Sequence, residues 1–250
     1  MVQQLTSAPE RQVPEMVYPD SDGQPMADNT LQFEWIVTIK ENLELLFSDN
    51  PEVFVAGDLL WYPVEGDNKT RRAPDAMVAF GRPKGYRGSY QQWKEDQIAP
   101  QVVFEVLSPG NTLSEMAKKL AFYQRFGVEE YYLYNPYSMD MGGWQRSGTF
   151  LAPIAEPNGW VSPRLGIRFE TTLGKPLKLF TPQSQLFLTF VELGKLRAQA
   201  EAERDQIAAE RDQIVVERDQ VTAERDQERQ RVDLLTAKLR ELGIDPNTLT

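Results

Sequence analysis

The protein has 250 residues, 41% of them hydrophobic, carries a formal net charge of −10, and contains neither cysteine nor histidine. The length allows one sizeable core and an additional segment. The two missing residue types exclude disulfides, thiolate chemistry, Ser-His-Asp hydrolysis and histidine-bound zinc. Any chemistry must therefore use carboxylates, Lys, Arg, Tyr, Ser or Thr, and a hard cation held by oxygen ligands, such as magnesium, is compatible with this set.

The distribution of apolar and charged residues indicates where the protein works. No long apolar run is present, and the first thirty residues lack the apolar core of a signal peptide, so we expect a cytoplasmic protein that does not enter a membrane. Most of the negative charge belongs to residues 1–194. An acidic body argues against nonspecific coating of nucleic acid, but it is compatible with a local basic strip or with a metal ion that bridges to phosphate.

The chain begins with a segment rich in Pro, Asp and Gln, which predicts an N-terminal arm over residues 1–27. A domain predicted over residues 28–192 starts with an amphipathic helix, for which Asp28 or Asn29 can provide the N-cap. Apolar side chains recur along this helix at spacings of three and four residues: Leu31, Trp35, Ile39, Leu43 and Leu46.

The middle of the chain alternates predicted strands and helices, which indicates an α/β domain. Four apolar runs predict strands at residues 53–63, 74–80, 101–107 and 129–136. Between the last two, Thr112 and Glu115 have capping-box spacing, and Gly127 ends the helix predicted over residues 112–126. Short apolar runs broken by Gly and Pro over residues 144–190 predict β-hairpins that complete or extend the sheet.

The composition changes abruptly near Leu193. The units AERDQIA, AERDQIV, VERDQVT and AERDQER repeat every seven residues, which predicts a long helix or coiled coil over residues 193–243, followed by a tail at 244–250. The d positions of the heptad are Ile207, Ile214, Val221, Leu235 and Leu242. The a positions are Arg204, Arg211, Arg218, Arg225, Val232 and Leu239. Because arginine at a weakens the seam, the pattern allows either a homodimer or a solvated extension.

The strand 101–107 contains one carboxylate, Glu105, between apolar neighbours. A buried carboxylate needs a cation, a proton or hydrogen-bond donors nearby. Asp75 opens the preceding predicted strand, and Lys119 lies on the inward side of the helix 112–126 together with Met116, Leu120, Tyr123 and Phe126. The three residues could form a buried structural ion pair, or a metal-and-cation site suited to phosphodiester hydrolysis.

Three stretches resemble a known family. "APDAMVAF", "VVFEVLSPGNT" and "KLAFYQRFGVEEYYLYNP" are similar to successive blocks of the Uma-two family of predicted restriction endonucleases, within the PD-(D/E)xK nuclease superfamily. The resemblance covers roughly residues 28–170. It implies a restriction-endonuclease-like mixed β-sheet flanked by helices, magnesium as cofactor, Asp75 and Glu105 as catalytic metal ligands, and Lys119 as the catalytic lysine.

The sequence departs from the superfamily pattern at two places. The lysine that usually follows the glutamate by two residues is replaced by Leu107, so the resemblance assigns this role to Lys119 of the following helix, an arrangement that the family shares. Many relatives have a histidine in the first helix, where this chain has Gln32 or a neighbour. The superfamily's further acidic residue from this helix could be Glu34, Glu41 or Glu44.

A polar loop at residues 81–100 offers a possible nucleic-acid contact. Arg82, Lys84 and Arg87 interleave with aromatic residues, a mixture that can follow a phosphate backbone and stack bases. An ordinary solvated loop explains the same pattern.

These features support two functional hypotheses of different classes. The first is a magnesium-dependent endonuclease that acts on DNA. The second is a catalytically silent nuclease-fold scaffold that associates through its C-terminal helix, and a variant of the first is a nuclease that needs a partner protein.

Overall fold

The computed structural model describes residues 16–243 of the chain. Residues 1–15 of the predicted arm and the predicted tail at 244–250 lie outside the described residues. The chain divides into two compact units, Met1–Phe190 and Val191–Thr250.

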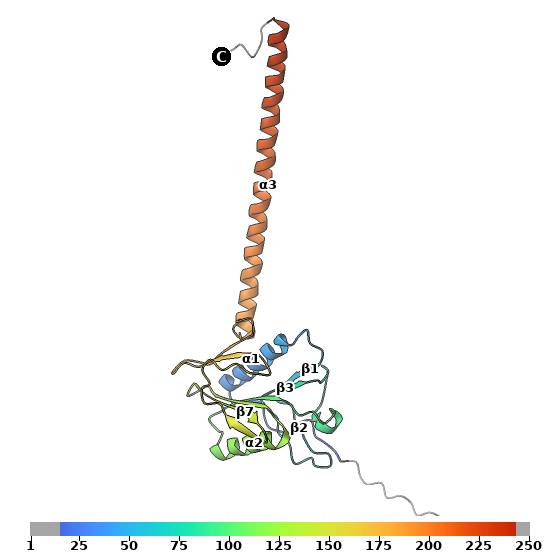
Figure 1. The fold of residues 1–250 in the computed structure, drawn as a ribbon, viewed down its shortest axis with the longest axis vertical. Helices are drawn as coiled ribbons and strands as arrows, with labels where there is room; N and C mark the ends of the chain where they lie inside the picture. Colours follow the sequence, from blue (N-terminus) through green and yellow to red (C-terminus); the bar gives the residue numbers. More distant parts are fainter. Residues whose placement is uncertain (1–15, 244–250) are drawn as a thin grey trace, which may run out of the picture. The chain divides into compact units, whose positions relative to one another are not determined.

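The first unit combines helices and strands, as expected from the alternating pattern (Figure 1). Its helices are α1 (Thr30–Leu46), the short 3-10 helix η1 (Gln92–Lys94) and α2 (Leu113–Phe126). Its strands are β1 (Val53–Ala56), β2 (Trp61–Tyr62), β3 (Ala76–Phe80), β4 (Tyr90–Gln91), β5 (Val102–Val106), β6 (Glu130–Asn135), β7 (Asp140–Ser147), β8 (Phe150–Pro153), β9 (Arg168–Glu170) and β10 (Lys178–Phe180).

Six of the strands form the central sheet, in the order β1-β3-β5-β6-β7-β8. β5 and β6 are parallel, whereas the other neighbouring pairs of this sheet are antiparallel. The pairs β9-β10 and β2-β4 form two smaller sheets. The predicted α/β class and mixed sheet are therefore confirmed, and the region 144–190 supplies the short strands expected there.

The two main helices cover opposite faces of the central sheet (Figure 1). Side chains alternate between the faces of a strand, so each strand contributes to both cores. Ile36, Ile39 and Leu43 of α1 pack with one set of strand residues, including Phe104. Tyr123 of α2 packs with the alternate set.

The inward side of α1 differs from the predicted stripe. Asn29 is the N-cap, and its side chain accepts a hydrogen bond from the backbone N–H of Gln32. The fully buried positions are Gln32, Ile36, Ile39 and Leu43. Leu31 is 38% exposed. In the first two turns the buried positions are therefore one residue later than predicted, at Gln32 and Ile36, and Gln32 can be buried because it has hydrogen-bond partners inside the protein.

The apolar run at 53–63 forms two short strands rather than the single predicted strand. β1 ends at Ala56, and Asp58 follows with a positive φ of 49°. Its backbone N–H donates to the carbonyl oxygen of Pro74 over 3.0 Å. A Cβ at Gly57 would lie 3.2 Å from the carbonyl oxygen of Asp75, so the turn requires a small residue where the chain passes β3.

The helix α2 begins and ends as its sequence predicts. The hydroxyl of Thr112 accepts from the N–H of Glu115 over 3.2 Å, and Gly127 ends the helix in the left-handed conformation with φ of 100°. Parallel strands need a crossover connection, and α2 is the crossover between β5 and β6. This topology lays α2 across the sheet beside the strand that immediately precedes it.

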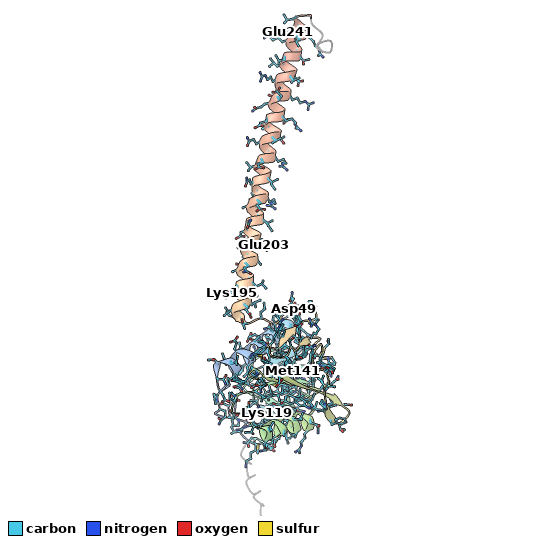
Figure 2. The ribbon with its side chains drawn as sticks, turned by 90° about the vertical axis from the view of Figure 1, so that its left-hand side faces the viewer. Asp49, Lys119, Met141, Lys195, Glu203 and Glu241 are labelled. Carbon is cyan, nitrogen blue, oxygen red and sulfur yellow. The ribbon has the colours of Figure 1, made fainter. Side chains whose placement is uncertain are left out.

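The second unit consists of the long predicted helix. α3 spans Phe190–Glu241, 52 residues, and none of its described side chains is buried. Figure 2 shows these side chains projecting along the whole helix. Within residues 16–243, no helix has the length and apolar character needed to cross a membrane.

Candidate active site

Asp75 and Glu105 lie side by side on the α2 face of the central sheet. Ala76 pairs with Phe104 in the antiparallel register, so Asp75 stands opposite Glu105, one step beyond the paired segment. Both carboxylates lie two residues from side chains of the α2-facing core, Met77 and Val103 respectively, and therefore point to the same face. Their exposed fractions are only 8% and 2%.

The carboxylate of Glu105 receives two donors from α2. Lys119 Nζ lies 2.8 Å from Glu105 Oε2, and the hydroxyl of Tyr123 donates to Glu105 Oε1. The two donors are four residues apart and hence one above the other on the same helix face. The prediction that Lys119 points inward is confirmed. The helical periodicity also places Tyr123 on this inward side, but its contact with Glu105 is not predicted from the sequence.

Asp75 is fixed by the end of β5. Asp75 Oδ2 accepts a hydrogen bond from the N–H of Val106 over 2.6 Å. The carbonyl oxygen of Val106 accepts from Gln32 Nε2 over 2.9 Å, and Gln32 Oε1 accepts from the N–H of Asp28 over 2.8 Å. Gln32 thus braces the strand that holds both Glu105 and the donor to Asp75.

The buried charges shift one another's pKa values. Burial, and then the neighbouring Glu105, raise the pKa of Asp75 well above its usual value. Burial alone would lower the pKa of Lys119, but the carboxylates of Glu105 and Asp75 outweigh it and raise that pKa. Lys119 is therefore an ammonium at neutral pH, and it acts as a hydrogen-bond donor and positive charge rather than as a base.

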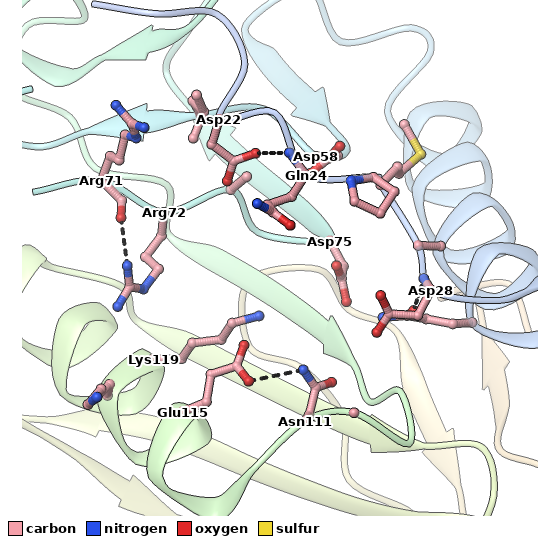
Figure 3. A pocket seen from close by; sticks show the side chains of 18 of the residues that line it. Asp22, Gln24, Asp28, Asp58, Arg71, Arg72, Asp75, Asn111, Glu115 and Lys119 are labelled. Atoms are coloured by element: carbon pink, nitrogen blue, oxygen red, sulfur yellow. Dashed lines mark hydrogen bonds between the residues drawn. The ribbon is translucent and has the colours of Figure 1, made fainter. Parts of the chain in front are cut away.

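A pocket of about 890 Å³ opens beside this cluster (Figure 3). Figure 3 shows Asp75 and Lys119 approaching its centre from the sheet and from α2. Five basic residues line it: Lys69, Arg71, Arg72, Lys118 and Lys119. Five acidic residues also line it: Asp22, Asp28, Asp58, Asp75 and Glu115.

Two of the cations in the pocket are available to a ligand. Arg71 and Arg72 form no ion pair within residues 16–243. Their guanidinium groups donate to the backbone oxygens of Asn68 and Arg71, and they lie over the rings of Tyr62 and Phe122. The backbone of Arg72 is anchored, because its N–H and C=O both bond to Trp61. Unpaired guanidinium groups on a fixed backbone are suited to phosphate oxygens. Neither arginine belongs to a motif that distinguishes it in the sequence.

The third acidic residue near the cluster is Asp58, which the sequence analysis also missed. Burial, followed by Asp22 and Glu105, raises its pKa, and Lys119 lowers it. The positions considered for a further acid in α1, namely Glu34, Glu41 and Glu44, do not line the pocket, and Glu44 instead pairs with Lys84. The feature of the sequence that could have indicated Asp58 is the Gly57-Asp58 pair, which interrupts the apolar run 53–63.

The structure does not bring the basic loop residues to this pocket. Arg82 and Arg87 both pair with Glu95, at 3.0 and 2.6 Å, and Lys84 pairs with Glu44 at 2.9 Å. Their role in binding nucleic acid stays a prediction. These ion pairs already neutralise the charges that a phosphate backbone would use.

The donor set at the cluster suits a magnesium ion that keeps part of its water shell. Within the described residues, no three carboxylates form a metal-binding group. Asp75 Oδ1 has no hydrogen bond with another described residue, and each oxygen of Glu105 accepts only one. Magnesium is commonly held by one or two carboxylates, with water and phosphate oxygens completing its octahedron. Asp75 and Glu105 are the residues that fit this role.

A mixed sheet between helices, with two neighbouring carboxylates and a lysine on one face, defines a nuclease-like α/β domain. The model of the Uma2 family, described as "Putative restriction endonuclease", matches residues 21–169, and the chain belongs to this family.

Two further comparisons complete this picture. No curated protein matches the chain significantly. A solved structure from Anabaena variabilis ATCC 29413, described as "a putative nuclease belonging to DUF820", is 14% identical, with a TM-score of 0.41 over 54% of this chain and 72% of that chain.

The raised pKa of Asp75 predicts how Asp75→Asn changes stability. A folded-state pKa above the unfolded value means that the stability contributed by Asp75 is present below its unfolded pKa and lost as pH rises through the folded one. Asparagine does not titrate and can still accept from Val106. Denaturant unfolding in EDTA should therefore show the variant gaining stability relative to the wild type from pH 4 to pH 8.

The exposed Asp49→Asn is the matched control, and it should follow the wild-type pH profile. A constant difference between Asp75→Asn and the wild type across this range would contradict the raised pKa.

Proposed function

We propose that this protein is a magnesium-dependent endonuclease that hydrolyses DNA phosphodiester bonds. The observation that carries the proposal is the contact of Glu105 with Lys119 next to Asp75, at the wall of a pocket with unpaired arginines. Membership of a family described as restriction endonucleases agrees with it. The pocket contains the three components of such a reaction: carboxylates for a metal ion, a fixed ammonium group, and cations for phosphate.

Asp75 and Glu105 can hold one ion together, although their environments differ. Asp75 presents its free oxygen to the pocket, whereas Glu105 is held in a fixed orientation by Lys119 and Tyr123. A bound magnesium ion would supply Lewis acidity, because it lowers the pKa of coordinated water and polarises phosphoryl oxygens. Neutralising two adjacent buried carboxylates would also remove the repulsion that raises the pKa of Asp75.

Lys119 and the arginines account for the remaining charge. Since Lys119 is an ammonium with three donors and only one hydrogen bond to Glu105, it can also orient the attacking water and stabilise the negative charge that develops on the phosphorus-bound oxygens. Arg71 and Arg72 line the same pocket. They would hold phosphates of the strand that is cut, which positions the scissile bond.

Plasmid cleavage with magnesium tests the assignment. Asp75→Asn, Glu105→Gln and Lys119→Gln each keep a polar group of similar size, so the fold should survive while the rate falls by about 100-fold or more. Asp49→Asn, an exposed acid outside the pocket, should cleave like the wild type. Equal cleavage by all five proteins would contradict the assignment.

Absence of cleavage by the wild type needs a second measurement. Calorimetric titration with magnesium separates the nuclease from the silent scaffold. If the wild type binds magnesium and Asp75→Asn does not, the protein is a nuclease that lacks its partner or target in the assay. No binding down to millimolar affinity would favour the silent scaffold.

Salt-dependent binding of a DNA duplex tests the arginines. Each phosphate contact contributes about 0.9 to the slope of log affinity against log salt, so Arg72→Gln should weaken binding and reduce the slope by about 1. Fluorescence anisotropy in EDTA measures this without cleavage. Lys84→Gln tests the loop in the same experiment, and a loss confined to Lys84→Gln would assign the phosphate contacts to the loop at 81–100.

A further inference from the structure

The helix α3 exposes a regular series of apolar side chains. Ile207, Ile214 and Val221 are 59%, 64% and 63% exposed, at intervals of one heptad. Leu235 and Leu242 continue the series at 54% and 72%. A helix of 52 residues is about 78 Å long, and no described residue along this length is buried. Apolar residues at such spacing are typical of a helix face that packs against another helix.

The helix does not carry the contacts that stabilise an isolated polar helix. The ion pairs in the heptad repeats of α3 join adjacent residues, for example Arg211 with Asp212 and Arg218 with Asp219, at 3.5 and 2.7 Å. Among described residues, no ion pair of α3 joins positions four apart. Gln–Glu hydrogen bonds at that spacing, such as Gln213 to Glu217, are few. A long solvated helix needs many such pairs, so α3 requires another source of stability.

The charges along the seam follow the apolar series. In each repeat a glutamate at g directly precedes the arginine at a, as in Glu210-Arg211 and Glu217-Arg218. The e positions of the first three repeats, Ala208, Val215 and Thr222, are uncharged, whereas that of the fourth is Arg229. The e residue of one helix faces the preceding g residue of its partner in a parallel coiled coil, so Glu224 has Arg229 as its e partner, and Glu203, Glu210 and Glu217 have no charged e partner. The arginine at a of the other helix lies next to them.

We propose that α3 pairs with α3 of a second copy as a parallel, two-stranded coiled coil, in which each arginine at a bonds the glutamate at g of the partner. The long arginine side chain can bury its methylene groups in the seam while its guanidinium group reaches the edge. The seam that looks weak from its apolar residues alone is therefore complementary in charge.

The same charges disfavour the antiparallel arrangement. Antiparallel helices bring g positions opposite one another, so a register that overlaps the four repeats would face Glu203, Glu210, Glu217 and Glu224 with glutamates of the partner. The basic g residues Arg231 and Lys238 lie beyond the repeats. Like charges across a seam oppose pairing and so select orientation. The end of the helix supplies an uncharged anchor: Val232, Leu235, Leu239 and Leu242 occupy successive a and d positions. Glu228, at the remaining d position, would face Glu228 of the partner, and Arg229 at e lies beside this layer and offsets its negative charge.

Parallel pairing places the two residues at which the helices begin, Phe190 of each copy, at the same end of the coiled coil. Two nuclease domains attached there could engage one duplex, a consequence that rests on the proposed function. The pairing itself does not depend on that function.

Disulfide trapping tests the orientation, because the natural chain has no cysteine. In the full-length protein, Ile207→Cys and Leu235→Cys place a thiol at d near either part of the helix. Parallel pairing brings each thiol to its counterpart, so each variant alone should form a covalent dimer under mild oxidation. Gln213→Cys, at the outward c position, is the control and should stay monomeric on a non-reducing gel.

Two outcomes would overturn the proposal. Cross-linking only in a mixture of Ile207→Cys at d and Leu239→Cys at a would indicate antiparallel helices, in which a packs against d. Monomeric or trimeric wild-type protein in sedimentation equilibrium would exclude the dimer.

A charge swap tests the glutamate–arginine pairs. Arg211→Glu with Arg218→Glu should weaken dimerisation at least about tenfold, because four attractive pairs become repulsive. Adding Glu210→Arg and Glu217→Arg restores opposite charges and should recover the dimer. Failure of this recovery, with helicity retained by circular dichroism, would contradict the pairing.

Discussion

The contact between Glu105 and Lys119 is the constraint on which the first unit depends. A carboxylate that is 2% exposed is costly to bury unless it is paired and hydrogen-bonded. Its two donors come from a single helix face, and that helix is the crossover between β5 and β6. The crossover thus covers the sheet and neutralises the charge at the same time. Removing it would leave Glu105 without either donor.

The same constraint shapes the pocket. Lys119 and Tyr123 occupy the carboxylate of Glu105 from the α2 side. Of the pair Asp75 and Glu105, Asp75 is the one that lines the pocket, and it is held by the backbone of β5 rather than by a cation. Its pKa is raised first by burial and then by the neighbouring Glu105, so the two residues form a close pair of acids. Such a pair, next to a permanent ammonium group and guanidinium groups without partners, is more readily explained by a bound cation and phosphate than by structural stability alone.

The sequence predicted the sheet, α2 and the grouping of Asp75, Glu105 and Lys119, because strand and helix periodicity fix which way these side chains point. It did not predict Asp58, since only the folded chain shows that the turn after β1 lies beside Pro74 and the pocket. Arg72 was missed for the same reason: its position depends on a bridge to Trp61. Gln32 shows the reverse case, where a polar residue takes a buried helix position that pattern alone gives to an apolar one.

The central claim is that Asp75 and Glu105 together hold one divalent ion beside Lys119. Crystals grown with manganese, which replaces magnesium at oxygen sites and scatters anomalously, test it directly. We predict one anomalous peak bonded to carboxylate oxygens of both Asp75 and Glu105. Anomalous peaks found only at other sites, such as crystal contacts, with no peak between Asp75 and Glu105 would contradict the account.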